Sequence, residues 1–381
     1  MRIAFISTMQ EAQWGGSEEL WSQTASRLKQ QGHEVMASVP HRSRLSERVT
    51  ALEQQGILLR THPSDHSARA LRIWHRLSRE SRKCYERLKR FHPDLAVISQ
   101  GFNAGGLEWA EAFREAAVPY VMIVHCNCEH WWFQDKFDQA VASYTAARKV
   151  FCVSHKNLDL LRLQISQPLP NAEVIRNPFN VSPDNALAWP DDSGTWRMAC
   201  VARLFLAAKG QDLLLQTLAC SEWRDRPVEL NLYGTGIDEK ALRRMAEAFD
   251  LKSVHFRGYV NDVASIWKQN HLLVLPSRFE GLPLALVEAM WCSRPAVVTD
   301  IGGNAELCID GQTGFVAPYP SVESFSQAME RAWERRGNWA QMGQAARAAV
   351  ENAVPKDAVS VFCDRLRACV AATTGAAPPR Q

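Results

Sequence analysis

The chain has 381 residues, which is enough for two or three domains. Hydrophobic residues make up 46% and charged residues 22% of it, so a disordered, collagen-like or coiled-coil protein is excluded. A net charge of +3 is too small to indicate a nucleic-acid partner, and we expect none.

Met1 and Arg2 lead directly into a short apolar run at residues 3–6, which predicts a buried first strand. This run is too short for the apolar segment of a secretory signal, and no later run reaches the roughly 20 residues that cross a bilayer. The ten cysteines are scattered, which favours reduced and mostly buried thiols. These features predict a cytoplasmic protein.

The first half of the chain alternates short apolar runs with amphipathic stretches. A helix is predicted over residues 17–30 with Gly32 after its end, and one or two helices over the basic segment 68–91. Further strands are predicted at residues 35–39, 95–98, 121–124 and 150–153. This alternation is typical of right-handed βαβ units around a parallel sheet.

A polar stretch with several prolines, from Asn177 to Gly194, predicts a linker between domains. After it the alternation restarts. Strands are predicted at residues 198–201, 229–233, 254–256, 271–275 and 296–299, and helices at 212–218, 238–250 and 284–291. One more helix follows Pro355. Two such halves form a cleft, and open α/β sheets bind ligands at the carboxyl ends of their strands.

Three features at predicted strand ends indicate chemistry. Gly15 and Gly16 follow the first strand and open a helix, where free backbone N–H groups can bind an anion; a plain strand-to-helix turn is equally open. Arg203 and Lys209-Gly210 follow the strand at 198–201, and two cations there suit a diphosphate. Taken alone, solvated loop cations are the simpler interpretation.

The segment from Pro276 to Met290 carries the strongest signal. It follows a buried strand and contains Glu280 and Glu288, separated by seven residues. Glu280 lies in a loop beside Gly281, whereas Glu288 lies in the helix among apolar neighbours. Carboxylates accept hydrogen bonds from sugar hydroxyls, so the two glutamates could hold two different sugar rings. The alternative is an acid favoured by the helix dipole and one solvated glutamate.

At this point the sequence resembles the retaining glycosyltransferases of family 4, the group 1 transferases with the GT-B fold. The segment from Glu280 to Glu288 resembles the family's E-x7-E motif, and Arg203 with Lys209-Gly210 resembles its donor-phosphate motif. The segments 233–236, 256–260, 302–306 and 311–315 resemble further family motifs, in the same order. The order and spacing together are highly specific.

The resemblance implies an α/β fold of two Rossmann-like domains with parallel sheets facing across a cleft. Residues 1–178 would form the acceptor-binding domain, joined by a C-terminal helix at about 356–373, and residues 179–355 the nucleotide-sugar domain. Residues 374–381 would form a disordered tail. Two departures concern loop geometry only: Ala202 stands where the family has glycine before the arginine, and Asn177-Pro178 stands where it has Asn-Gly.

Carried over position by position, the resemblance also implies roles for single residues. Those implied to act in catalysis are His125, Glu280, Arg203 and Lys209. Those implied to bind the donor are Gly15, Gly16, Gly234, Val260, Gly281, Leu282, Pro283 and Glu288. Arg203 and Lys209 would neutralise the diphosphate, Glu288 would hold the ribose, and Glu280 and His125 would position the donor sugar.

The expected reaction moves a hexose from a nucleotide-diphosphate sugar to a hydroxyl of a saccharide or lipid-linked acceptor. The cations would stabilise the charge that develops on the leaving diphosphate, so we expect no metal and no cofactor. No carboxylate stands out as a nucleophile for double displacement, which favours retention by attack on the same face. The family context favours envelope polysaccharide or glycolipid synthesis.

Other interpretations stay open. A nucleotide-sugar epimerase shares this architecture and would need no acceptor, whereas a sugar-binding protein would tolerate loss of Glu280 and Arg203. A phosphorylase-like enzyme would need a cofactor lysine and free phosphate. The run from His125 to His130 contains two cysteines and raises the alternative of a zinc site, but ligands this close in sequence rarely complete a tetrahedron.

Two surface features are ambiguous. Trp131, Trp132 and Phe133 could form a platform for an acceptor sugar or belong to the core. The segment 68–91 contains nine lysines and arginines among apolar residues, so it could lie on the anionic inner face of the membrane or be a solvated helix.

Overall fold

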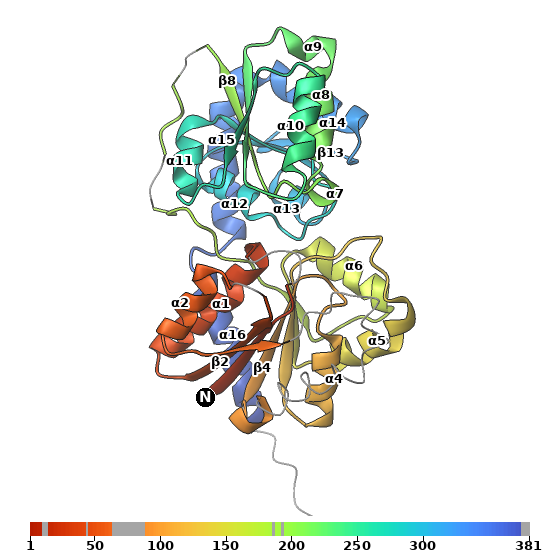
Figure 1. Cartoon of the computed structure of the whole chain (residues 1–381), viewed down its shortest axis with the longest axis vertical. Helices are drawn as coiled ribbons and strands as arrows, with labels where there is room; N and C mark the ends of the chain where they lie inside the picture. The colour runs from red at the N-terminus through yellow and green to blue at the C-terminus, as the bar shows by residue number, and fades with distance from the viewer. Residues whose placement is uncertain (10–13, 43–44, 63–87, 185–186, 192–193, 375–381) are drawn as a thin grey trace, which may run out of the picture. The chain divides into compact units, whose positions relative to one another are not determined.

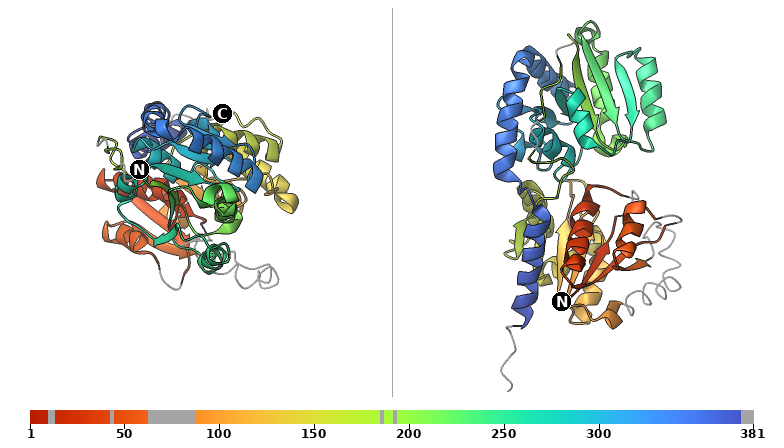
Figure 2. Two further views of the ribbon diagram at one scale, coloured as in Figure 1. Left: turned by 90° about the horizontal axis from the view of Figure 1, so that it is seen from above. Right: turned by 90° about the vertical axis from the view of Figure 1, so that its left-hand side faces the viewer.

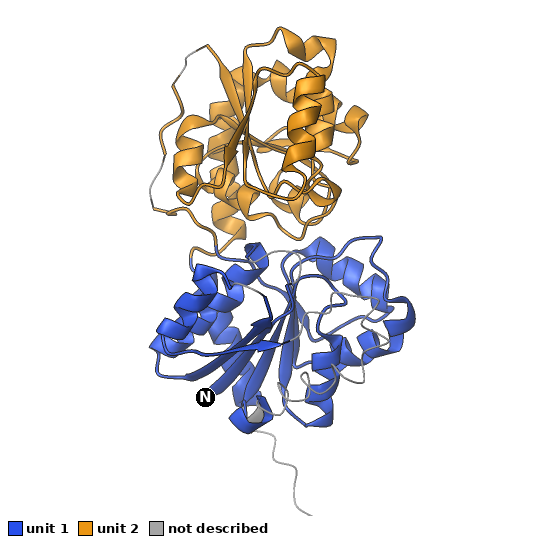
Figure 3. Ribbon diagram, in the orientation of Figure 1, with its two compact units in different colours: residues 1–178, 357–381 blue, residues 179–356 orange. Residues whose placement is uncertain are grey.

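A computed structural model of the chain describes residues 1–9, 14–42, 45–62, 88–184, 187–191 and 194–374. It divides into two compact units, drawn in different colours in Figure 3. Unit 1 comprises Met1–Pro178 and Asp357–Gln381, and unit 2 comprises Phe179–Lys356. Each unit has one parallel sheet with helices on both faces.

Unit 1 is built on a seven-stranded sheet in the order β3-β2-β1-β4-β5-β6-β7, in which all pairs of neighbours are parallel. Its strands are β1 (Arg2–Ser7), β2 (Glu34–Pro40), β3 (Leu58–His62), β4 (Leu95–Gln100), β5 (Tyr120–Val124), β6 (Lys149–Cys152) and β7 (Ala172–Val174). Its helices are α1 (Gly16–Gln30), α2 (Glu47–Gln54), α4 (Leu107–Glu115), α5 (Phe137–Ala146), α6 (His155–Ile165) and α16 (Ala358–Thr374), with the 3-10 turn η2 (Gln134–Lys136).

The alternation of side chains along the strands of unit 1 separates its core into two layers. Ile3 and Phe5 of β1 pack on the side of α1, α2 and α16, whereas Ala4 and Ile6 pack on the side of α4, α5 and α6. Figure 1 shows these helices on the two faces of the sheet. Both faces of β1 are therefore buried, which explains its continuous apolar sequence.

The C-terminal helix α16 returns the end of the chain to unit 1, where it is the darkest blue helix in the right-hand view of Figure 2. Phe362 lies edge-on to Phe151 of β6, with 5.2 Å between ring centroids, and shares a core with Trp21 and Leu28 of α1. The helix predicted over about 356–373 thus extends to Thr374, and the rest of the predicted tail lies outside the described residues.

Unit 2 is built on a six-stranded parallel sheet in the order β10-β9-β8-β11-β12-β13. Its strands are β8 (Trp196–Val201), β9 (Val228–Tyr233), β10 (Val254–Gly258), β11 (Leu272–Leu275), β12 (Ala296–Thr299) and β13 (Gly314–Ala317). Its helices are α7 (Leu206–Lys209), α8 (Gln211–Ala219), α9 (Ser221–Arg224), α10 (Glu239–Ala248), α11 (Val263–Gln269), α12 (Leu284–Trp291), α13 (Asn304–Leu307), α14 (Val322–Glu334) and α15 (Trp339–Ala353), with the 3-10 turn η3 (Arg336–Asn338).

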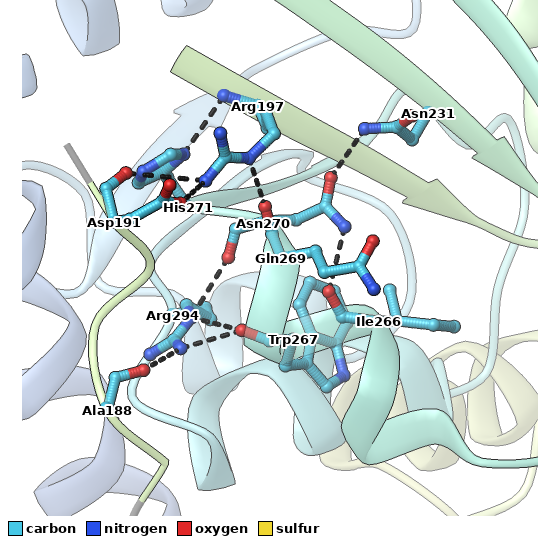
Figure 4. Close-up of polar contacts among 10 residues, drawn as sticks. All are labelled: Ala188, Asp191, Arg197, Asn231, Ile266, Trp267, Gln269, Asn270, His271 and Arg294. Atoms are coloured by element: carbon cyan, nitrogen blue, oxygen red, sulfur yellow. Dashed lines mark hydrogen bonds and ion pairs between the residues drawn. The ribbon is translucent and has the colours of Figure 1, made fainter. Parts of the chain in front are cut away.

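The stretch predicted to be a linker packs on unit 2 instead. Arg294, which has no exposed surface, donates hydrogen bonds to the carbonyls of Ala188 (2.6 Å), Trp267 (2.7 Å) and Asn270 (3.0 Å), as Figure 4 shows. Burial lowers the pKa of this guanidinium to about 10, so it stays charged at neutral pH. Nearby, Asp191 accepts a hydrogen bond from Arg197 at 2.5 Å. The Ala188 carbonyl and the Asp191 carboxylate therefore attach this stretch to unit 2.

The predicted strands all occur within a few residues of their expected positions. The prediction did not include β3, β7 and β13 or several helices, among them α4, α5, α6, α14 and α15. Two Rossmann-like units with parallel sheets confirm the predicted fold class. Except for Leu88 to Phe91, the basic segment 68–91 lies outside the described residues.

Candidate active site

Glu280 lies in the loop between β11 and α12 and is only 7% exposed. Its Oε1 atom accepts hydrogen bonds from Ser277 Oγ at 2.9 Å and from Lys209 Nζ at 2.5 Å. Lys209 is the last residue of α7, far from Glu280 in sequence, so only the fold brings the two together. Glu280 is buried and Lys209 is half-buried, so both charges lose water and the pair gains little net stability, which favours a functional role.

Close backbone packing fixes this ion pair. Gly210, after Lys209, has a φ angle of 63°, and a Cβ atom there would lie 2.1 Å from the carbonyl oxygen of Pro276. Arg278 N–H donates to the carbonyl of Ala208 at 2.8 Å. Only glycine at position 210 lets the two loops come this close.

A second ion pair supports the same two loops. The Arg278 guanidinium binds both carboxylate oxygens of Asp212, at 2.6 and 2.7 Å. Hydrogen bonds from Arg278 to this carboxylate raise the pKa of the arginine, so the pair stays charged. The loop that carries Lys209 and the loop that carries Glu280 thus behave as one structural element.

Arg203 follows β8, and its carbonyl accepts a hydrogen bond from Gln211 Nε2 at 2.8 Å. The neighbouring carbonyl of Ala202 would lie 2.1 Å from a Cβ atom on Gly234, whose φ angle is 120°. The Gly234 N–H also donates to the carbonyl of Gly258 at 2.7 Å, two residues before Val260. The loops after β8, β9 and β10 are therefore joined, and they hold the predicted Arg203, Gly234 and Val260.

Glu288 lies in α12 and is 3% exposed. Its Oε1 atom accepts hydrogen bonds from the backbone N–H of Asn180 at 3.0 Å and from Asn180 Nδ2 at 2.9 Å. Sequence analysis gave Asn180 no role beyond the predicted linker, two residues after Asn177-Pro178, where the chain departs from the family pattern. The carboxylate predicted to hold a ribose therefore also anchors the start of unit 2.

The remaining predicted donor residues of unit 2 surround the start of α12. The carbonyl of Gly281 accepts a hydrogen bond from Gly303 N–H at 2.7 Å, and a Cβ atom on Gly302 would lie 2.3 Å from the carbonyl oxygen of Glu280. Leu282 is 7% exposed, and Pro283 is the N-cap residue of α12. The glycine pair at 302–303 is thus the support of the Glu280 loop.

His125 follows β5 in unit 1 and is 6% exposed. Its Nε2 atom lies 3.1 Å from Ser99 Oγ, and its buried Nδ1 atom has no hydrogen-bond partner among the described residues. Burial lowers the pKa of His125 to about 3, because the imidazolium would lose its water without gaining a counter-charge. The side chain is therefore a neutral imidazole at physiological pH.

Gly15 and Gly16 begin α1, with Gly15 as its N-cap residue. The first turn of α1 carries Glu18, to which sequence analysis assigned no role. Glu18 is 4% exposed and accepts hydrogen bonds from Ser7 Oγ (2.9 and 3.0 Å) and Trp21 Nε1 (3.0 Å). Burial raises the pKa of its carboxyl to about 7. The position of Glu18 two residues after the glycine pair was the only sequence signal.

Within the described ranges, no group of three or more His, Cys, Asp or Glu side chains is arranged to hold a metal ion. Within the run from His125 to His130, Asn127 exchanges hydrogen bonds with Asn157 of α6. Asn127 Nδ2 donates to the Asn157 carbonyl at 2.9 Å, and Asn157 Nδ2 donates to Asn127 Oδ1 at 2.5 Å.

Among the helices that the structure describes, none is both long and apolar enough to span a membrane.

Two family profiles match the chain in adjoining regions. The profile "Glycosyltransferase Family 4" matches residues 14–182, and "Glycosyl transferases group 1" matches residues 196–335. An uncharacterised glycosyltransferase of Haemophilus influenzae is 28% identical over 258 residues, which cover 66% of this chain and 69% of that protein. The D-rhamnosyltransferase WbpZ of Pseudomonas aeruginosa is 32% identical over 164 residues, or 40% of this chain.

The matched stretch spans less than half of the length of some relatives. It covers 42% of WbpZ. An uncharacterised glycosyltransferase of Methanocaldococcus jannaschii is 29% identical over 45% of this chain, which is 46% of that protein. Solved structures agree over nearly the whole chain. HepE of Anabaena in complex with UDP-glucose has a TM-score of 0.74 at 19% identity and covers 97% of this chain and 99% of its own. Sucrose-phosphate synthase of Thermosynechococcus elongatus has a TM-score of 0.73 at 15% identity, covering 98% and 99%.

The profiles match both units, and the parallel sheets agree with solved glycosyltransferase structures of the GT-B fold. The expectation of a transferase is confirmed at the level of the family. With the E-x7-E segment and its supporting loops in unit 2, this chain belongs to the group 1 glycosyltransferases of family 4.

Proposed function

We propose that this protein is a retaining hexosyltransferase that moves a sugar from a nucleotide-diphosphate sugar to an acceptor hydroxyl. The observation that carries the proposal is the ion pair of half-buried Lys209 with buried Glu280, held by the loops after β8 and β11 of unit 2. Carboxyl ends of parallel strands are where such sheets bind nucleotides. The HepE structures contain UDP, UDP with glucose, or UDP-glucose, which supports a nucleotide-sugar donor.

Charge stabilisation is the main task that we assign to unit 2. When the sugar–phosphate bond breaks, negative charge develops on the departing diphosphate. Lys209 has three donors, so it can keep its hydrogen bond to Glu280 and donate to phosphate oxygens at the same time. Arg203 would bind a second pair of oxygens. With two cations in this role, the proposed reaction needs no metal, and chelation with EDTA should leave the rate unchanged.

Glu280, Glu288 and His125 are proposed to position the two sugar rings of the donor. Glu280 is already engaged by Lys209 and Ser277, which favours orienting a hydroxyl over attacking the anomeric carbon. His125 is neutral, so its Nδ1 atom would offer a hydrogen bond to the donor sugar instead of a positive charge. Because the proposal assigns no carboxylate as a nucleophile, the acceptor hydroxyl would attack from the face that the diphosphate leaves, with retention, and the leaving phosphate would take the hydroxyl proton.

Cell-envelope polysaccharide or glycolipid synthesis is the proposed context, with a saccharide or lipid-linked acceptor. Two relatives support this context. They are the D-rhamnosyltransferase WbpZ and an Escherichia coli galactosyltransferase whose name includes a diphosphoundecaprenol substrate. A cytoplasmic location and contact of the basic segment 68–91 with anionic membrane stay predictions. Co-sedimentation of the full chain with phosphatidylglycerol vesicles tests the membrane contact.

The deciding experiment has two stages. A thermal-shift panel of nucleotide diphosphates and nucleotide sugars should reveal a donor, because a ligand of the folded state raises its melting temperature. Transfer to acceptors is then compared between wild type and Lys209→Ala, which should lose at least about a hundredfold in rate. Lys252→Ala is the matched control, because Lys252 is an exposed lysine of unit 2.

Three results would contradict the proposal. Near-normal transfer by folded Lys209→Ala would refute the assigned site. An altered nucleotide sugar formed without acceptor would indicate an epimerase. Binding of nucleotide sugars with no turnover under any acceptor would indicate a non-catalytic sugar-binding protein.

A further inference from the structure

Buried amide side chains hold the loop that follows His125 through hydrogen bonds to its backbone. Gln164 of α6 donates to the carbonyls of Cys128 at 2.9 Å and Trp131 at 3.1 Å, and Asn103 donates to the same Trp131 carbonyl at 3.1 Å. Both amides have no exposed surface. These bonds reach the backbone, so they fix the path of the loop whatever its side chains are.

Aromatic residues of this loop divide between core and surface. Phe133 is 3% exposed and packs edge-on against Tyr144, with 6.1 Å between ring centroids. Trp132, one position earlier, is 52% exposed. Its indole Nε1–H donates to the carbonyl of Glu129 at 2.7 Å, which holds the ring in place and satisfies its polar atom. The loop thus presents a large apolar ring to solvent in a fixed orientation.

The charges beside this ring discriminate between ligands. In the sequence on either side of Trp132, Glu129, Asp135 and Asp138 are exposed, and Lys136 is exposed as well. The excess of acidic over basic residues in this segment disfavours insertion of Trp132 into an anionic membrane. Carboxylates accept hydrogen bonds from hydroxyl groups, so the same segment suits a neutral, hydroxyl-rich ligand.

We propose that Trp132 is the stacking platform for a pyranose ring of the acceptor. The C–H face of the sugar would cover the indole, and its hydroxyls would bind the carboxylates of Glu129 and Asp135. A rigid indole loses little conformational entropy on binding, which suits it to this role. The inference rests on the proposed function and adds to it that the acceptor is a saccharide that unit 1 recognises through the loop that follows His125.

The test uses the full chain labelled with 5-fluorotryptophan and fluorine NMR. Comparison with Trp132→Phe identifies the Trp132 resonance among those of the other tryptophans. Methyl glycosides of glucose, galactose and mannose, with N-acetylglucosamine, are the saccharide probes, and UDP and phosphatidylglycerol vesicles are the comparison probes. We expect a saturable shift of the Trp132 resonance with at least one saccharide and none with UDP or vesicles.

Two NMR results would overturn the inference. One is a Trp132 resonance that no saccharide probe moves. The other is a resonance that responds to vesicles, which would assign Trp132 to a membrane surface.

Kinetics provides the second measurement. Trp132→Ala should raise the acceptor KM about tenfold to a hundredfold, the range for losing contact with one aromatic ring, while the donor KM stays unchanged. Leu163→Ala is the matched control, because Leu163 is a 63% exposed apolar residue of α6 in the same unit. An unchanged acceptor KM in Trp132→Ala would contradict the inference.

The failure of this inference is distinguishable from failure of the proposed function. If wild type and Trp132→Ala both bind a nucleotide sugar in the thermal-shift assay and no saccharide shifts the Trp132 resonance, only the stacking platform is refuted. If wild type binds no nucleotide sugar, the proposed function is refuted, whatever the saccharide titration shows.

Discussion

The buried carboxyl of Glu18 makes the stability of unit 1 dependent on pH. Burial raises its pKa from 4.5 to about 7, so the folded chain binds this proton more tightly than the unfolded chain does. The stabilisation is fully present below about pH 4.5 and is lost as the pH rises through about 7. At about 1.4 kcal/mol per pKa unit, the loss amounts to about 3 kcal/mol.

Replacing Glu18 by glutamine removes this titration and keeps a side-chain oxygen for the hydrogen bonds from Ser7 and Trp21. Between about pH 4.5 and pH 8, wild type should therefore lose about 3 kcal/mol of unfolding free energy relative to the variant. Urea unfolding followed by circular dichroism at several pH values measures this difference, because other titrating groups cancel in the comparison.

The control is Glu53→Gln, which removes one exposed carboxylate from the same unit. Its pH profile should run parallel to that of wild type. If the profiles of wild type and Glu18→Gln also run parallel, burial does not raise the pKa of Glu18, and the reasoning is refuted.

Three further predictions concern unit 2 and His125. Arg294→Leu should destabilise unit 2 by about 3–5 kcal/mol in urea unfolding, because buried carbonyls lose their donors; a loss below about 1 kcal/mol would contradict this. Gly302→Ala should abolish the thermal shift by a nucleotide sugar, since its Cβ atom would lie 2.3 Å from the Glu280 carbonyl oxygen; Gly337→Ala has no atom within 4 Å and should keep the shift. Because burial lowers the His125 pKa to about 3, this residue should not affect the pH dependence of the transfer rate near pH 6.5. The pH–rate profiles of wild type and His125→Gln should therefore have the same shape there.

The inner strands of the sheets could be predicted because they are buried on both faces. Residues 272–275 and 296–298 are continuous apolar runs bounded by polar residues or proline, and such runs indicate parallel strands. By contrast, β7 (Ala172–Val174) is three residues long, half-buried and at the edge of its sheet. Its sequence lacks an apolar run, so no periodicity could reveal it.

The candidate site was only partly predictable. Glu280 and Lys209 could be named from their motifs, but no local pattern indicated that they share a hydrogen bond 2.5 Å long. The partner of Glu288 was missed because Asn180 lies in a polar segment that resembles a linker. The burial of Glu18 was missed because a glutamate in the first turn of a helix is ordinarily a solvated residue favoured by the dipole.

Local patterns were enough to predict two α/β halves, the order of the motifs and the residues proposed to bind a diphosphate, because periodicity and turn residues act locally along the chain. Tertiary structure alone decided the pairings, such as Lys209 with Glu280 and Arg294 with the carbonyl of Ala188. It also decided which ionisable groups lose their water and hence shift their pKa. Parallel strands align the carboxyl ends of segments that are far apart in sequence, and contacts and desolvation there depend on loops that meet only after the sheet has formed.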